Sequence, residues 1–224
     1  MTTRPSCSDI TVGVLIYQST SYLEWTVQGL MNWTEEIGIF VLGNDPTEEV
    51  AAHPLVSQVY HDPEPNDYYL HRVYRAWNEC LRRIETPWVI LWNSDMYPSR
   101  GWLDALLEAW TPERLVVSAL VEPASNQCGP MGYFGTPRAF REKEWLAFAD
   151  HKRRKQVTPL DGIPYMPCLL DREKVLSIGG YPIKSHFRDG VAGDALLFKA
   201  LGLEHVRVDD SLVYHVYEGE MRLK

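Results

Sequence analysis

Short apolar runs alternate with amphipathic stretches along the first half of the chain. A continuous apolar run is typical of a strand that is buried on both faces of a sheet. Such runs predict strands over Ile10 to Tyr17, Ile37 to Leu42, Val56 to Tyr60, Trp88 to Trp92 and Leu115 to Val121. Helical spacing predicts helices that start near Ser21, cover Thr47 to Ala52, span Leu70 to Ile84 and cover Leu103 to Trp110. This alternation predicts an α/β fold with a doubly wound, mainly parallel sheet and helices on both faces.

The second half of the chain is less regular but uses the same kinds of element. A loop rich in Gly and Pro covers 122–137, and its length favours a functional role over a plain connection. We expect helices over Ala139 to Asp150, Asp171 to Ile178 and Ala192 to Leu201, followed by strands at Glu204 to Val208 and Leu212 to Val216. Because no repeat, low-complexity segment or linker interrupts these elements, we expect a single domain.

Composition is that of an ordinary globular protein, with 45% hydrophobic and 23% charged residues. The net charge of −8 argues against a protein that relies on non-specific contacts with DNA. The four cysteines, Cys7, Cys80, Cys128 and Cys168, are far apart, so neither a zinc knuckle nor a dense disulfide framework is expected. No apolar run approaches the ~20 residues of a membrane span, and the polar N-terminus lacks a signal-peptide pattern. We therefore expect a cytoplasmic protein.

Polar residues follow three of the predicted strands, at the edge where open parallel sheets bind ligands. Tyr17 and Gln18 follow the first strand, Asn44 and Asp45 follow the second, and the tripeptide 93–95 (Asn-Ser-Asp) follows the fourth. A carboxylate at the end of an apolar strand is costly to desolvate unless something pairs with it. A turn role is about as common for these residue types, so each of them alone leaves the question open.

Two later residues add to this set. Asp194 lies at the start of a predicted helix, and His215 lies at the end of a predicted strand. Singly, an Asp in the first helical turn and a partly buried His are also common structural features. Together with Asp95, however, they provide oxygen and nitrogen ligands for a divalent metal and a carboxylate that can act as a general base.

The order of these motifs resembles that of the family 2 glycosyltransferases of the GT-A fold, over Ile10 to about Glu218. The local match is strongest where the tripeptide 93–95 occupies the place of the Asp-x-Asp motif and Pro98 begins a Pro-x-x-x-Trp-Leu segment. A Gly-Gly-Tyr segment at 179–181 and Gly193-Asp194 then match the later motifs, and His215 matches the closing metal ligand.

The resemblance implies a GT-A, Rossmann-like domain and an inverting glycosyltransferase. It assigns Mn²⁺ or Mg²⁺ to Asp95 and His215 and the role of general base to Asp194. It further implies a nucleotide-sugar donor, with a UDP-sugar as the first candidate, in the half formed by 1–121, and acceptor binding in the half formed by 122–224. The donor-binding residues it implies are Tyr17, Gln18, Asn44, Asp45, Asn78, Asn93 and Ser94.

Three positions depart from the family pattern. Asn93 replaces the first Asp of Asp-x-Asp, so metal binding would depend on Asp95. Gly193 replaces a Glu beside the expected base, and Gly43 replaces the Asp that binds the nucleotide base, with Asp45 two positions further on.

Two other functions compete with this interpretation. A sugar-nucleotide nucleotidyltransferase would share the fold, but residues 13–17 lack the Gly-rich, basic signature of such enzymes. A non-catalytic module that binds nucleotide or carbohydrate would tolerate Asn93 and Gly193. The acceptor stays open among a glycan, a lipid, a protein and a hydroxylated nucleic-acid base, the last recognised through the basic segment 151–155. We expect its recognition to come from 122–137 and 151–190.

Overall fold

A mostly parallel sheet forms the centre of the molecule. The computed structural model describes residues 4–124, 128–160, 167–183 and 193–216. The first sheet has the strand order β3-β2-β1-β4-β8, with β1 (Ile10–Ile16), β2 (Gly38–Asn44), β3 (Gln58–Tyr60), β4 (Trp88–Asn93) and β8 (Leu169–Asp171). The pairs among β1, β2, β3 and β4 are parallel, and β8 runs antiparallel to β4. Every residue of β1 is buried, as its continuous apolar run predicted.

A second, smaller sheet lies beside the first. It has the order β5-β9-β6, with β5 (Met96–Pro98), β9 (Glu204–His215) and β6 (Arg114–Val121), and β7 (Val157–Pro159) also pairs with β9. The strand β6 is parallel to β9, whereas β5 and β7 are antiparallel to it. Because β5 follows β4 after a two-residue connection, the two sheets meet where the Asn-Ser-Asp tripeptide lies.

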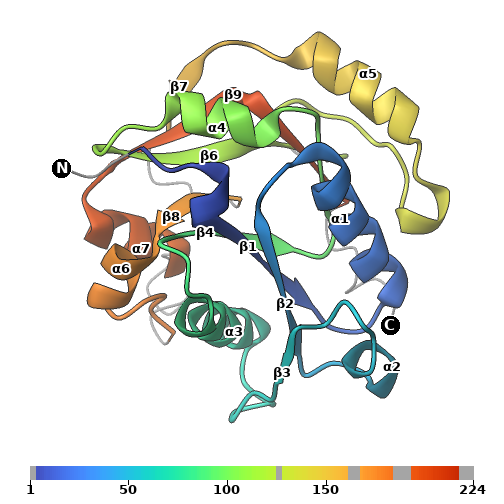
Figure 1. Ribbon diagram of the computed structural model, residues 1–224, viewed down its shortest axis with the longest axis vertical. Helices are drawn as coiled ribbons and strands as arrows, with labels where there is room; N and C mark the ends of the chain where they lie inside the picture. Colours follow the sequence, from blue (N-terminus) through green and yellow to red (C-terminus); the bar gives the residue numbers. More distant parts are fainter. Residues whose placement is uncertain (1–3, 125–127, 161–166, 184–192, 217–224) are drawn as a thin grey trace.

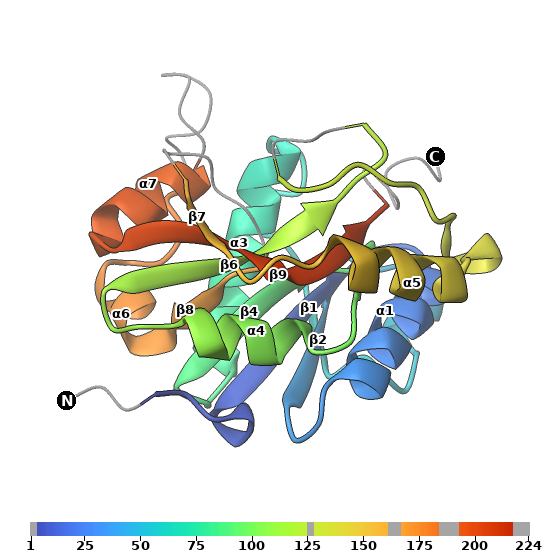
Figure 2. The same ribbon diagram turned by 90° about the horizontal axis from the view of Figure 1, so that it is seen from above.

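Helices cover both sheets, as Figure 1 shows. They are α1 (Thr20–Trp33), α2 (Glu48–Ala51), α3 (Tyr69–Arg83), α4 (Trp102–Ala109), α5 (Glu142–Lys152), α6 (Arg172–Ser177) and α7 (Gly193–Leu201), with 3₁₀ turns at Cys7–Asp9 and Pro137–Ala139. The helices α1 and α3 lie on opposite faces of the first sheet, and α4 and α5 lie over β6 and β9 (Figures 1 and 2). At one end of the molecule α6 and α7 pack together. This arrangement confirms the predicted doubly wound, mainly parallel α/β fold.

The last strand differs from the prediction in an informative way. We expected two strands, 204–208 and 212–216, but the structure has one long strand, β9. The register with β6 shifts between Ser118, which pairs with Val208, and Ala119, which pairs with Leu212. The polar residues 209–211 therefore form an irregularity within one strand. Because polar residues are typical of turns, the sequence predicted a break between two strands there.

Several boundaries and short strands also differ from the sequence-based expectation. The N-cap of α1 is Ser19, not Ser21, and α5 begins at Glu142 after a separate 3₁₀ turn. The three-residue strands β5, β7 and β8 were not predicted, because runs this short carry no detectable period. The expected long helix α3, by contrast, is present over Tyr69–Arg83.

Candidate active site

Strand ends converge at one edge of the first sheet. In the parallel register of β1 with its neighbours, Leu15 pairs with Asn93 of β4, and Ile16 pairs with Gly43 of β2. The carboxyl ends of β1, β2 and β4 therefore lie side by side, which brings the polar residues that follow them to a common edge. This is the edge at which open α/β sheets bind ligands.

Asp95 and His215 are brought together by the second sheet. The antiparallel pairing of β5 with β9 places Met96 opposite His215, and the N–H of Val216 donates to the carbonyl oxygen of Asp95 at 2.9 Å. Nε2 of His215 lies 3.3 Å from Oδ2 of Asp95. The structure thus pairs two residues that are 120 positions apart in the sequence and were both expected to bind a metal.

Glu122 completes this group, and sequence analysis did not identify it. Its Oε1 lies 2.7 Å from Nδ1 of His215, so the imidazole bridges two carboxylates. Burial lowers the pKa of His215, but the attraction of Asp95 and the hydrogen bond and charge of Glu122 outweigh burial and raise the pKa to about 10.

The donor set fits a divalent metal that is shared with a phosphate ligand. Asp95 offers a carboxylate oxygen and His215 an imidazole nitrogen, a combination suited to Mn²⁺ and acceptable to Mg²⁺. Within the described ranges, no group of three or more His, Cys, Asp or Glu side chains is arranged to hold a metal. Among the described residues, Asp95 and His215 are therefore two candidate ligands, and a metal there would need its other ligands from water or from a bound molecule.

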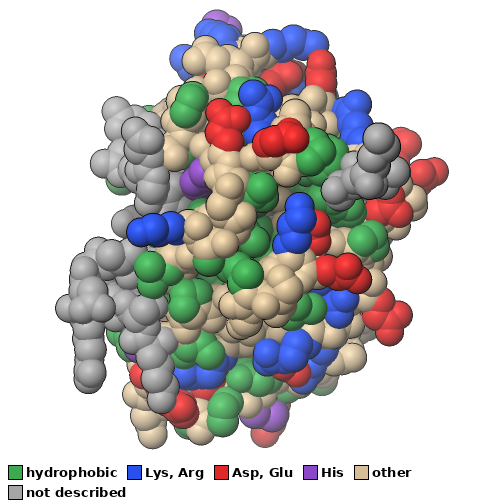
Figure 3. Space-filling model, turned by 90° about the vertical axis from the view of Figure 1, so that its left-hand side faces the viewer, with side chains coloured by type: hydrophobic (Ala, Val, Ile, Leu, Met, Phe, Trp, Pro, Cys, Tyr) green, Lys and Arg blue, Asp and Glu red, His purple; other side chains and the backbone are tan. Residues whose placement is uncertain are grey.

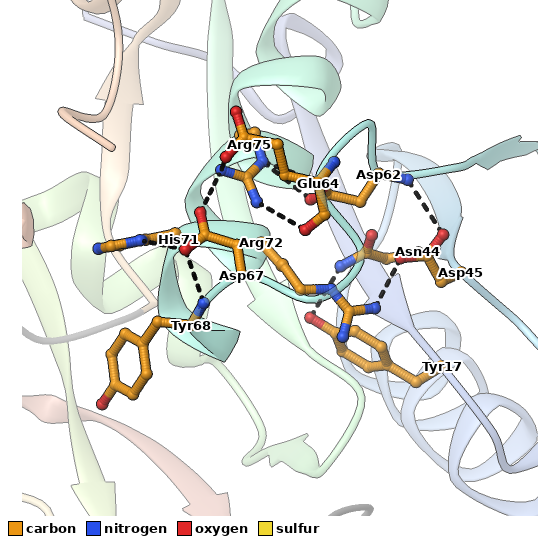
Figure 4. A network of polar contacts seen from close by, with 10 residues as sticks. All are labelled: Tyr17, Asn44, Asp45, Asp62, Glu64, Asp67, Tyr68, His71, Arg72 and Arg75. Atoms are coloured by element: carbon orange, nitrogen blue, oxygen red, sulfur yellow. Dashed lines mark hydrogen bonds and ion pairs between the residues drawn. The ribbon is translucent and has the colours of Figure 1, made fainter. Parts of the chain in front are cut away.

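A second polar cluster lies beyond the ends of β1 and β2 (Figure 4). The amide nitrogen of Asn44 donates to the hydroxyl of Tyr17 at 3.0 Å. Backbone N–H groups tie the adjoining loop down, since Asp45 donates to the carbonyl of Tyr60 at 2.9 Å and Thr47 donates to that of Tyr17 at 3.1 Å. The structure thus brings Tyr17, Asn44 and Asp45 together, as expected for one pocket.

The Asp45 carboxylate is paired with a helix residue that sequence analysis did not single out. Arg72 of α3 donates to Oδ2 of Asp45 at 2.6 Å, and the backbone N–H of Asp62 donates to Oδ1 at 3.0 Å. Asp45 also has a left-handed backbone, with φ of 46°. Nε of Arg72 is buried and has no hydrogen-bond partner within the described part of the chain. Position 72 lies at the start of α3, so only the fold places it beside Asp45.

A buried ion-pair network anchors the start of α3 next to this cluster (Figure 4). Arg75 donates from Nε to both carboxylate oxygens of Asp62, at 2.9 and 3.0 Å, and from Nη1 to Asp67 at 2.8 Å. The side chain of Asp62 is fully buried, and that of Arg75 is 8% exposed. Hydrogen bonds from Arg75, and then from His71, hold the pKa of Asp67 well below its usual range. The network fixes the loop that carries Asp62 against α3.

Asn78, expected among the donor-binding residues, is engaged elsewhere. Its amide nitrogen donates to the carbonyl of Tyr181 at 3.0 Å, and its amide oxygen accepts from the N–H of Tyr181 at 2.7 Å. Gly180 has a φ of 77°, and a Cβ there would stand 2.3 Å from the amide oxygen of Asn78. Asn78 therefore clamps the Gly-Gly-Tyr segment to α3.

Asp194 begins α7 beside two aromatic rings. Tyr74 of α3 is hydrogen-bonded to Asp194 and stacks on Tyr181 at a centroid distance of 5.4 Å. The Oδ1 atom of Asp194 is buried and has no hydrogen-bond partner within the described residues. Burial raises the pKa of Asp194 to about 6, and the hydrogen bond from Tyr74 opposes part of that increase. One carboxylate oxygen is thus ready to accept a proton close to neutral pH.

The remaining expected positions differ in how far they are buried. Gln18 is exposed, Asn93 is half-buried at the end of β4, and Ser94 is buried. The basic segment 151–155 begins in the last turn of α5 and continues beyond its end at Lys152. Acidic and basic side chains are interspersed over the face in Figure 3. Residues 125–127 of the first expected acceptor segment, and 161–166 and 184–190 of the second, lie outside the described residues. No helix among the described residues has the length and apolar character needed to cross a bilayer.

Comparison with solved structures identifies the fold. The chain superimposes on GalNAc-T7 with a TM-score of 0.65 and 13% identity, covering 94% of this chain and 44% of that protein. It matches residues 1–349 of TarS from S. aureus with a TM-score of 0.60 and 12% identity, covering 93% of this chain and 60% of that chain. The chain has the GT-A glycosyltransferase fold.

A third structure with the GT-A fold is the mannosyltransferase PcManGT from Pyrobaculum calidifontis, with a TM-score of 0.58 and 16% identity. The match covers 93% of this chain and 56% of that chain. The GalNAc-T7 structure holds UDP, GalNAc and Mn²⁺, and the PcManGT structure holds GDP-Man and Mn²⁺. No protein-family model and no curated protein sequence matches the chain. At these identities the comparison establishes the GT-A fold, and the chain spans about half the length of its structural neighbours.

Proposed function

We propose that the protein is a metal-dependent glycosyltransferase that transfers a sugar from a nucleoside-diphosphate sugar to an acceptor hydroxyl. The observation that carries this proposal is the pairing of Asp95 with His215 at 3.3 Å, next to the strand ends that also bear Tyr17 and Asn44. A nucleotide that spans this edge would have its base near Tyr17 and its diphosphate near Asp95. The solved neighbours that hold UDP or GDP-Man together with Mn²⁺ support a nucleotide-sugar donor and a divalent metal.

Asp95 and His215 would hold Mn²⁺ or Mg²⁺. Bound there, such an ion neutralises the charge that develops on the departing diphosphate. The imidazole ligand favours Mn²⁺ over Mg²⁺. Asn93 and Ser94 lie directly before Asp95, and we assign them contacts with the ribose and the phosphates.

The cluster at the ends of β1 and β2 would bind the nucleoside. Tyr17 offers a ring that can stack on the base, and its hydroxyl is fixed by Asn44. Asp45 and Arg72 together present an acceptor and a donor, which suits the alternating acceptor and donor groups of uracil. We therefore favour a UDP-sugar as the donor, with exposed Gln18 at the rim of the pocket.

Asp194 would act as the general base. Its Oδ1, which has no hydrogen-bond partner among the described residues, would take the proton from the acceptor hydroxyl. At the same time the acceptor oxygen would form its bond to the anomeric carbon, and the bond from that carbon to the diphosphate oxygen would break. Attack from the face opposite the leaving group inverts the anomeric centre. Tyr74 would hold the carboxylate in position through its hydrogen bond.

We divide the chain into a donor-binding half and an acceptor-binding half. We assign donor binding to the half formed by 1–121 and acceptor binding to the half formed by 122–224, where Met131 and Tyr133 are 54% and 53% exposed. The thiols of Cys7, Cys80, Cys128 and Cys168 are all free, which fits the expected cytoplasmic setting.

A thermal-shift series tests the proposal. UDP, GDP, ADP and CDP would be added with Mn²⁺ or with EDTA, and we expect the largest rise in Tm for UDP with Mn²⁺. Absence of any metal-dependent shift with all four nucleotides would overturn the proposal. Turnover of a UDP-sugar is then measured as the amount of UDP released. Release of pyrophosphate from a sugar phosphate and UTP would identify a nucleotidyltransferase instead, and binding without any turnover would favour a non-catalytic module.

A further inference from the structure

Glu122 lies where the second sheet brings its carboxylate to His215. In the parallel pairing of β6 with β9, Val121 is opposite Tyr214, so Glu122 follows β6 directly beside His215, the last residue of β9. The loop after β6 is held in turn, since the N–H of Gly132 donates to the carbonyl oxygen of Glu122 at 3.0 Å. Sheet register and loop pairing thus fix the backbone of Glu122 on both sides.

The carboxylate of Glu122 is buried, and His215 is its hydrogen-bond partner. Its side chain is 6% exposed and lies 2.7 Å from Nδ1 of His215. Removing a carboxylate from water costs several kcal/mol unless it is paired and hydrogen-bonded. Packing alone does not explain an acidic residue at this position, because an apolar residue of similar size would avoid that cost.

The two nitrogens of His215 face different partners. Nδ1 faces Glu122, and Nε2 faces Asp95 at 3.3 Å. A proton held on Nδ1 by Glu122 leaves the lone pair of Nε2 as the one that a metal beside Asp95 can accept. Glu122 lies on the far side of the ring from that position and is therefore not a third ligand.

We propose that Glu122 is a positioning residue that fixes the orientation and tautomer of His215 and so sets the affinity of the site for Mn²⁺. This inference rests on the proposed function, which places the metal between Asp95 and His215. A hydrogen bond from a metal-binding imidazole to a carboxylate also makes the ligand nitrogen more basic. Loss of such a partner typically lowers metal affinity by about 10- to 100-fold.

The test measures Mn²⁺ binding directly. Titration of the full chain with Mn²⁺ in the presence of UDP, followed by electron paramagnetic resonance of free Mn²⁺, gives a Kd for each variant. We expect Glu122→Ala to raise that Kd by about 10- to 100-fold. Glu122→Gln, which keeps an acceptor for Nδ1–H but removes the charge, should fall between Glu122→Ala and the unmodified protein. The ¹⁵N resonances of His215 should show a protonated Nδ1 in the Mg²⁺-loaded protein and a mixture of tautomers in Glu122→Ala.

Glu142→Gln is the matched control. Glu142 also accepts a short hydrogen bond, at 2.6 Å from the hydroxyl of Tyr97, but it lies on α5. Its substitution should leave the Kd for Mn²⁺ unchanged. If Glu122→Ala fails to fold, the Kd of Glu122→Gln for Mn²⁺ tests the proposal in its place.

The outcomes separate this inference from the proposed function. If the unmodified protein binds no Mn²⁺ with UDP present, the proposed function and this inference both fail. If the unmodified protein binds Mn²⁺ and the Glu122 variants bind it equally well, the role of Glu122 is refuted while the metal site stands. A raised Kd with an unchanged His215 tautomer would also refute the positioning role.

Discussion

The ring of Tyr74 occupies the space that a side chain at position 193 would need. A Cβ on Gly193 would stand 2.6 Å from Cε2 of Tyr74 and 3.1 Å from the carbonyl oxygen of Pro182. Tyr74 is itself 2% exposed and stacked on Tyr181, so it has no room to move away. The absence of a side chain at Gly193 therefore leaves room for an aromatic residue that hydrogen-bonds to Asp194.

We expect Gly193→Ala to destabilise the fold by about 1–3 kcal/mol, the usual cost of overpacking. The added methyl group must displace the Tyr74 ring or the backbone near Pro182. Urea unfolding measures the change. In a Tyr74→Leu background the same substitution should cost less, because a smaller side chain vacates the space. Equal costs in the two backgrounds would show that the two positions are not coupled.

The proposed base should control the acid side of the pH–rate profile. Because burial raises the pKa of Asp194 to about 6, kcat/KM should fall about tenfold per pH unit below pH 6, where the carboxylate becomes protonated. Asp194→Asn should remove that limb and lower kcat by about 10²- to 10⁴-fold, with UDP affinity nearly unchanged. A product that keeps the donor's anomeric configuration would refute the inverting mechanism.

The same carboxyl group should also affect stability. Its pKa is raised on folding, from 3.8 to about 6, so its contribution to stability is full below pH 3.8 and is lost as the pH rises through 6. At pH 8 Asp194→Asn should therefore be more stable than the unmodified protein, by up to about 3 kcal/mol. Unfolding curves at pH 4 and pH 8 give the comparison. A loss of stability at pH 8 would contradict the buried, ionised carboxylate.

The alternation of apolar and amphipathic segments was enough to predict the doubly wound sheet. Its long elements, such as β1 and α3, are specified by local periodicity. The second sheet was not predicted, because β5 has three residues and β9 contains the irregularity at 209–211. Pairing between segments over 90 residues apart is decided by tertiary contacts that no local pattern records.

Some residues of the candidate site could likewise be predicted from the sequence, and others could not. Asp95 was singled out after an apolar strand and His215 at the end of another, the resemblance to a known family joined them, and the structure pairs them. Three residues were missed. Arg72 and Tyr74 lie on α3 and Glu122 lies just after β6, and a basic, aromatic or acidic residue at such places gives no signal in the sequence. Their roles arise from what the fold places beside them.

We expect substitutions of Asp95 and of the nearby Asn93 to have different effects on metal-dependent UDP binding. Asp95→Ala should abolish the Mn²⁺-dependent part of UDP binding, because it removes one of the two protein ligands, and His215→Ala should weaken it. Asn93→Asp should be tolerated, since it adds a second carboxylate at the same edge. Calorimetric titration with UDP, with and without EDTA, measures both effects. Unchanged UDP affinity in Asp95→Ala under both conditions would exclude the metal role.

The Arg75 network should be important for stability. Arg75→Met leaves the fully buried carboxylate of Asp62 without its partner, and breaking a buried ion pair costs about 3–5 kcal/mol. Arg82→Met is the matched control on the same helix, because Arg82 is 58% exposed and its ion pair with Glu79 is worth about 0–1 kcal/mol. Guanidinium unfolding distinguishes them. Similar costs for the two variants would mean that the Arg75 pair is solvated.

The last prediction concerns recognition of the nucleotide base by Asp45 and Arg72. Their side chains are 22% and 26% exposed and are joined at 2.6 Å, so each keeps surface with which to contact a ligand. A hydrogen bond to a charged group contributes about 1.5–3 kcal/mol, which corresponds to about a 10- to 100-fold change in affinity.

Asp45→Ala and Arg72→Met should therefore each raise the KM for a UDP-sugar by about 10- to 100-fold, with a much smaller effect on kcat, because the base lies away from the reacting atoms. The same substitutions should lower the selectivity for UDP over GDP, since Asp45 and Arg72 provide the acceptor and the donor that uracil requires. His61→Ala is the control, because His61 lies 3.7 Å from Asp45 but is 80% exposed, and its loss should leave KM unchanged. An unchanged KM in both Asp45→Ala and Arg72→Met would place the base elsewhere along the sheet edge.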